Sequence, residues 1–71
     1  MFEGMSRSEI EYLIDEWIVD MNHAERNRLV MKRKVIDGLT FEEAAEEFEL
    51  STVQVKNIVK QCKERLKGKT V

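Results

Sequence analysis

Four helix starts share one local signal, and they constrain the fold of this chain more than any other feature. Each is a capping box, in which Ser, Thr or Asn is followed three residues later by Glu or Gln. The four pairs are Ser6 with Glu9, Asn22 with Glu25, Thr40 with Glu43, and Ser51 with Gln54. The chain has no Pro and only three Gly, so few residues interrupt a helix. The sequence therefore predicts a small all-α fold of four helices.

The apolar residues behind each cap recur at helical spacing and give approximate bounds. We expect helices at about residues 7–20, 23–36, 41–48 and 52–67, in a single domain that covers residues 1–71. Gly38 is suited to end the second helix in the left-handed conformation, and Gly68 to end the fourth. Trp17 falls on the apolar stripe of the first helix, which predicts a core position or a dimer contact.

Residues 40–67 predict a helix-turn-helix without a wing. The connection at residues 49–51 is too short for two helices to pack antiparallel, so they should cross steeply. Ala44 and Ala45 are small enough to let the next helix approach, while Leu50 would fill the angle and Val55 would face inward. The alternative is an ordinary helical corner in a small bundle.

The charge is divided unevenly along the chain, although the net charge is only −2. Residues 1–50 carry six basic and thirteen acidic groups, whereas residues 51–71 carry six basic groups against Glu64 alone. A basic last helix suits the phosphate backbone of DNA. The alternative is that these cations only complement the dipole of the helix C-terminus.

Helical geometry predicts which side chains would contact DNA. With the apolar stripe of the last helix turned inward, its outward face carries Thr52, Val53, Gln54, Lys56, Asn57, Lys60, Gln61 and Lys63. Gln54 and Asn57 suit adenine, Val53 suits a thymine methyl group, and Lys56 suits guanine or phosphate. Lys60, Lys63 and Lys67 are expected to contact phosphates, which fix the register of the helix on DNA.

A second basic cluster lies on the predicted second helix and consists of Arg26, Arg28, Lys32, Arg33 and Lys34. Runs of charge on a helix usually form a solvated face. The cluster could otherwise add contacts to the DNA backbone or bind a partner.

Other function classes find little support in the sequence. His23 is isolated and is expected at the surface, and Cys62 lies on the inward stripe of the last helix. We therefore predict no catalytic residue, no metal site and no cofactor. A single Cys suits a reducing compartment, and no apolar run approaches the length of a membrane span. These features predict a cytoplasmic protein.

The segment IDGLTFEEAAEEFELSTVQVKNIVKQCKERL resembles region four of bacterial sigma factors and, more loosely, LuxR-type effector domains. The resemblance implies DNA binding in transcription and docking on RNA polymerase. The family usually opens its recognition helix with residues rich in Arg and Glu, where this chain has Thr52, Val53 and Gln54. The alternative is an interaction module of the transcription machinery that binds RNA polymerase or another factor through its acidic helices, without DNA contact. With so little basic surface, a DNA-binding form is expected to need dimerisation or tethering to polymerase.

Overall fold

The computed structural model describes residues 3–67, which form an all-helical domain. Its helices are α1 (Arg7–Trp17), α2 (Ala24–Val35), α3 (Phe41–Glu47) and α4 (Thr52–Lys67), and the described residues contain no strand. The predicted all-α class is confirmed, and the predicted bounds of α4 are matched. The predicted helix end at Gly68 lies outside the described residues.

Three of the four predicted capping boxes are present. In the first, the Ser6 hydroxyl accepts from the Glu9 amide and the Glu9 carboxylate accepts from the Ser6 amide. Thr40 and Glu43 make the same reciprocal pair at α3. At α4 the Ser51 amide donates to Oε1 of Gln54 at 2.9 Å, and the Gln54 amide donates to the Ser51 hydroxyl at 3.1 Å. Each box satisfies two amides that a helix start leaves without partners.

The fourth capping box, Asn22 with Glu25, was predicted wrongly. The N-cap of α2 is His23, which lies in the left-handed region with φ 58° and makes no side-chain capping bond. The backbone carbonyl of Asn22 instead accepts from Nδ2 of Asn27, a side chain that is only 3% exposed. The tight turn at residues 18–23 therefore takes the place of a capped entry into α2.

The prediction that the first helix continues to residue 20 was also wrong. Ile18 leaves the helical region with ψ 74°, and Asp20 takes a positive φ of 56°. Side chains from other helices then take up the carbonyls beyond the helix end. Nη1 of Arg28 donates to the Ile18 carbonyl at 2.8 Å, and Nη1 of Arg65 donates to the Val19 carbonyl. These bonds give partners to the carbonyls of Ile18 and Val19, which lie beyond the helix end.

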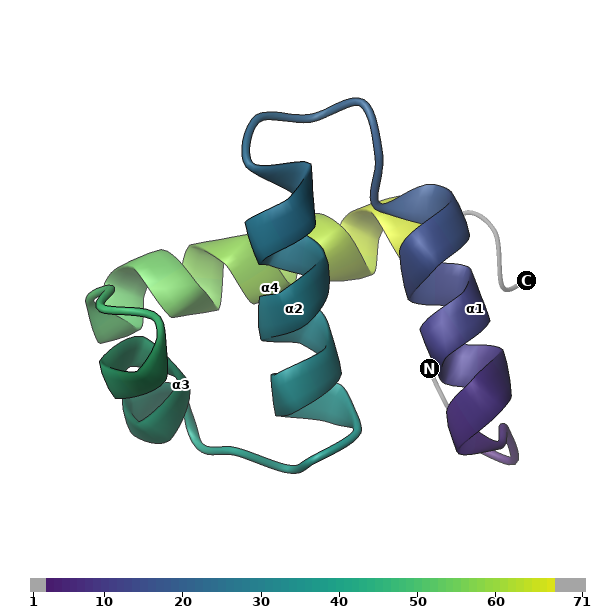
Figure 1. Ribbon diagram of the computed structural model, residues 1–71, viewed down its shortest axis with the longest axis horizontal. Helices are drawn as coiled ribbons and strands as arrows, with labels where there is room; N and C mark the ends of the chain where they lie inside the picture. Colours follow the sequence, from purple (N-terminus) through teal and green to yellow (C-terminus); the bar gives the residue numbers. More distant parts are fainter. Residues whose placement is uncertain (1–2, 68–71) are drawn as a thin grey trace.

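Helix α4 is the centre of the fold and contacts each of the other three helices. It runs along the long axis of the molecule, with α2 across its middle, α3 beside its first turns and α1 near its end (Figure 1). The core is built from the inward stripes of all four helices: Ile14, Ile18, Val30, Met31, Ala44, Ala45, Val55, Ile58, Val59, Cys62 and Leu66. The predicted inward positions of the last helix are therefore confirmed.

The connection between α3 and α4 holds the two helices at a fixed angle. Glu49 lies in the left-handed region with φ 55°, and its amide donates to the Glu46 carbonyl at 3.4 Å. The Leu50 amide donates to the Ala45 carbonyl at 2.8 Å. This pair of bonds is a Schellman motif, which normally carries Gly at the position that Glu49 occupies. Leu50 packs partly buried against the core, as predicted.

Candidate nucleic-acid interface

The capping box at Ser51 determines where α4 begins and therefore which side chains its first turn presents. It also engages a predicted DNA contact, because Oε1 of Gln54 accepts from the Ser51 amide. Bidentate pairing of a Gln with adenine needs the side-chain oxygen as well as the nitrogen. Gln54 thus remains a predicted DNA contact, but its side-chain oxygen already accepts a hydrogen bond from the Ser51 amide.

The structure divides the predicted contact residues between two faces of α4. One is the lysine stripe, defined here as Lys56, Lys60, Lys63 and Lys67. These positions recur at helical spacing, so their side chains leave one flank of the helix over about 16 Å. The four lysines, Glu64, Val59 and Phe41 line a groove of about 310 Å³. All four lysines are predicted DNA contacts, and they belong to a single cationic flank.

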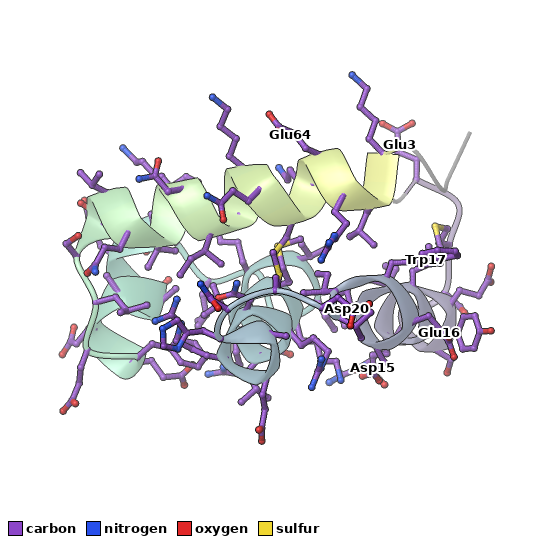
Figure 2. All side chains as sticks on the ribbon, turned by 90° about the horizontal axis from the view of Figure 1, so that it is seen from above. Glu3, Asp15, Glu16, Trp17, Asp20 and Glu64 are labelled. Carbon is purple, nitrogen blue, oxygen red and sulfur yellow. The ribbon has the colours of Figure 1, made fainter. Side chains whose placement is uncertain are left out.

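The second face lies beside the stripe and is neutral up to Gln61, with Glu64 one turn further on. It carries Val53, Gln54, Asn57 and Gln61, all exposed, with the Val53 side chain 63% accessible. Glu64 extends from the same outward side of α4, away from the other helices (Figure 2). Thr52 is half-buried and lines a separate hollow of about 280 Å³ with Thr40, Phe41, Glu42 and Lys56. A neutral polar face with cations along one edge can place amide side chains against base edges and ammonium groups against a phosphate strand.

Phe41 is the residue of this region that the sequence did not single out. It is the first residue of α3, and two ammonium groups lie near its ring, with Lys34 Nζ 4.7 Å and Lys56 Nζ 5.6 Å from the ring centre. A cation over an aromatic face is attracted by the ring, so Phe41 orients the first lysine of the stripe. The sequence signal was an aromatic residue directly after a helix cap, which alone does not predict its neighbours.

The acidic start of α3 makes it a poor anion site. The Glu43 carboxylate accepts from the Thr40 amide at 2.9 Å, and this hydrogen bond lowers the pKa of Glu43. Glu42 is exposed in the same turn. The carboxylates of the first turn of α3 would therefore repel a phosphate that approached the amides of this helix start.

The basic cluster predicted on the second helix is used within the fold. Arg28 binds the end of α1, and Lys32 Nζ lies 2.8 Å from a carboxylate oxygen of Asp15. Lys34 lies over Phe41. Arg26 donates to Oδ1 of Asn27 at 3.3 and 3.4 Å. These cations mainly make contacts within the fold and do not form a freely solvated face.

Arg33 is the most extensively bonded member of that cluster. Its Nε and Nη2 atoms each donate to an oxygen of Glu47 at 2.8 Å, and Nη1 donates to Asp37 at 2.9 Å. Hydrogen bonds with Arg33 hold the pKa of Glu47 below its usual value. Hydrogen bonds with Glu47 and Asp37 in turn raise the pKa of Arg33, which stabilises its charged form. This bidentate pair ties α2 to α3.

The remaining reactive side chains have structural roles. Cys62 is buried, and desolvation raises its pKa to about 11, which keeps the thiol protonated at neutral pH. Its predicted place in the core is confirmed. His23 is exposed, as expected. Among residues 3–67, no group of three or more His, Cys, Asp or Glu is arranged to hold a metal ion.

In the described part of the chain, no helix combines the length and the apolar character needed to cross a bilayer. Comparison with models of known protein families, with curated proteins and with solved structures gave no match for this chain.

Proposed function

We propose that this chain binds double-stranded DNA, with α3 and α4 acting as a helix-turn-helix and α4 docking in the major groove. The observation that carries the proposal is the pairing of the lysine stripe with the neutral face on one exposed helix. In the docked state Val53, Gln54 and Asn57 would meet base edges, and Lys56, Lys60 and Lys63 would meet phosphates of one strand, with Thr52 at the margin. A DNA-bound regulator or sigma-like accessory factor is the role that fits this arrangement.

The charge balance supports a docking helix that is helped by a second contact. The net charge is −2, and Arg65 is turned toward α1, so the four lysines carry most of the basic surface of α4. A few phosphate contacts give weak, salt-sensitive binding. We therefore expect the DNA complex to need either a second copy of the chain, as a homodimer, or tethering to RNA polymerase.

A titration of duplex binding against salt concentration tests the proposal. With four to six phosphate contacts, log K should fall with log salt at a slope of about −4 to −5. The double variant Lys56→Ala/Lys60→Ala should reduce the slope by about 1.8, because each lost phosphate contact removes about 0.9. Lys32→Ala is the matched control, since Lys32 of α2 pairs with Asp15 of α1 and its loss should leave the slope unchanged.

The second candidate is an interaction module that contacts RNA polymerase or another protein without touching DNA. One observation favours it: the α2 cations are engaged inside the fold, which leaves little basic surface for nucleic acid. The absence of duplex binding at low salt would remove the DNA proposal and leave this candidate.

A further inference from the structure

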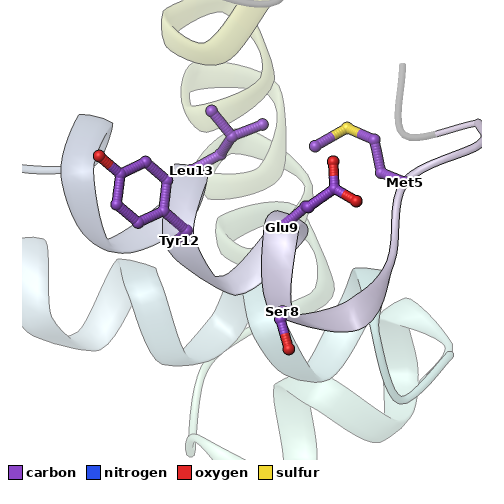
Figure 3. Close-up of a pocket in the computed structure, with 5 residues that line it drawn as sticks. All are labelled: Met5, Ser8, Glu9, Tyr12 and Leu13. Carbon is purple, nitrogen blue, oxygen red and sulfur yellow. The ribbon is translucent and has the colours of Figure 1, made fainter.

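The outward side of α1 carries an apolar hollow among exposed polar side chains. Met5, Ser8, Glu9, Tyr12 and Leu13 line this hollow, whose volume is about 330 Å³. Tyr12 and Met5 stand on opposite sides of it, with Leu13 and Glu9 between them (Figure 3). The Tyr12 side chain is 63% exposed, and Trp17 on the same helix is 38% exposed. An exposed aromatic residue at the edge of a hollow, such as Tyr12 here, is typical of protein contact sites.

The charges around this hollow are negative. Helical spacing places Glu9, Tyr12, Leu13 and Glu16 on one face of α1, which we call the α1 face. Glu16 lies at the outer edge of the molecule next to Trp17 (Figure 2) and is exposed, with no hydrogen bond or ion pair to any described residue. The one basic residue of α1, Arg7, pairs with Glu11 and Asp37 on another side of the helix.

From this combination we infer that the α1 face binds a basic segment of another protein. An apolar side chain of that segment would enter the hollow between Met5 and Tyr12, and its Lys or Arg residues would pair with Glu9 and Glu16. A second copy of this chain fits less well. In a symmetric contact the same patch faces itself, which would bring Glu9 and Glu16 of the two copies together.

The proposal separates α1 from the other acidic helix. Helix α3 exposes Glu42, Glu43 and Glu46, but it carries none of the large exposed apolar side chains found among residues 3–67. Charge alone would attract a basic segment to either helix, whereas an apolar anchor requires α1. The inference does not rest on DNA binding, because the α1 face and the lysine stripe are on different helices.

A random 12-residue peptide library selected against the full chain provides the test. Enriched peptides should combine Lys or Arg with an aromatic or aliphatic residue. One of them, synthesised, should shift the emission of Trp17, the only tryptophan, and the amide resonances of α1. Tyr12→Ala and Glu16→Lys should each weaken its binding by about tenfold or more. Glu46→Lys on α3 is the matched control and should change the affinity by less than about twofold.

Several results would overturn the inference. The first is enrichment of peptides without a cationic bias. The second is a peptide that binds the Tyr12→Ala and Glu16→Lys variants as well as it binds the native chain. The third is a set of resonance shifts confined to α3 or α4. Self-association that Tyr12→Ala abolishes in sedimentation would identify a second copy as the occupant instead. Circular dichroism shows whether the two variants keep their helices. Both should bind duplex DNA like the native chain, so loss of peptide binding and loss of DNA binding remain distinguishable.

Discussion

Helices α2 and α4 both carry a run of basic residues, yet the two runs serve different purposes. On α2, Arg28 and Arg33 reach a backbone carbonyl of α1 and the carboxylate of Glu47 on α3. On α4, the lysine stripe lies along an exposed flank and Arg65 alone turns inward to α1. The difference follows from the neighbours. The α2 cations face acceptors on adjoining helices, whereas the lysine stripe faces a groove with one acidic residue, Glu64.

The comparison shows why a count of charges is a weak guide to a binding surface. An arginine carries five N–H donors in a rigid fork, so one side chain can join two elements through carboxylates or carbonyls. A lysine keeps a flexible, well-hydrated ammonium group and loses little by staying in solvent. Inter-helix bonds therefore use mainly the arginines of this chain, and the exposed cationic flank consists of lysines.

The largest expected effect separates the core side of α4 from its outward side. Val55 is fully buried and Val53 is 63% exposed, although they lie two residues apart. Val55→Asp places an unpaired carboxylate in the core and should cost about 3–5 kcal/mol, enough to unfold so small a domain. Val53→Asp should stay folded and weaken duplex binding through repulsion of the phosphates. Urea unfolding and circular dichroism measure the first effect. Equal loss of stability in both variants would contradict the division of α4 into two sides.

The next effect tests the comparison of α2 with α4 directly. Arg28→Ala removes a charge-assisted bond to the Ile18 carbonyl and should destabilise the domain by about 1.5–3 kcal/mol. Lys60→Ala should change the free energy of unfolding by less than about 0.5 kcal/mol, because Lys60 is exposed. Thermal unfolding of the two variants measures the contrast.

The same pair of variants gives the opposite order in a binding measurement. Lys60→Ala should lower the salt slope of duplex binding by about 0.9, whereas folded Arg28→Ala should keep the native slope. If Arg28→Ala reduced the slope and left stability intact, the α2 cluster would have to be reassigned to DNA contact.

The sequence was sufficient for the parts of the fold that local signals determine. Three capping boxes and the inward stripe of α4 act within a few residues, so their pattern can be read directly. The failure at residues 18–23 has a non-local cause. Arg65 is far along the chain from Val19, and no spacing rule connects them. Bonds from Arg28 and Arg65 to the carbonyls after α1 stabilise the turn at residues 18–23, which stands where the sequence predicted a cap at Asn22.

The sequence predicted which residues belong to the candidate site but not how they are arranged around α3. Helical geometry identified the outward residues of the last helix, and all but half-buried Thr52 are exposed. It did not predict the groove beside the lysine stripe, because that groove depends on where α3 lies beside α4. Phe41 of α3 lines this groove and contacts Lys56, and that contact exists only once α3 and α4 have packed.

A smaller effect concerns the two turns on either side of α3. Gly38 and Glu49 both have positive φ, 73° and 55°, and a Cβ at Gly38 would meet nothing within 4 Å. The left-handed conformation costs a side-chain-bearing residue about 1–2 kcal/mol, and Gly loses about 0.5–1 kcal/mol more in backbone entropy. Glu49→Gly should therefore stabilise the domain by about 0.5–1 kcal/mol, and Gly38→Ala should destabilise it by a similar amount. Chemical unfolding measures both. Unchanged duplex binding by Glu49→Gly would show that the turn still presents α4 at its native angle.

The smallest expected effect is a pH dependence that belongs to the contact between α2 and α3. Arg33 lowers the pKa of Glu47 in the folded state, so this carboxylate stabilises the fold at neutral pH. That contribution should disappear as the pH falls below the usual Glu value of 4.5 and through the lowered one. Glu47→Gln should thus be less stable than the native chain at pH 7, and the gap should close toward pH 3. Glu46→Gln, on the same helix, is the matched control, because Glu46 makes no ion pair with any described residue. Exposed pairs contribute little, so urea midpoints at several pH values are needed. A gap that widened in acid would mean that the Arg33–Glu47 bond does not tie α2 to α3 in solution.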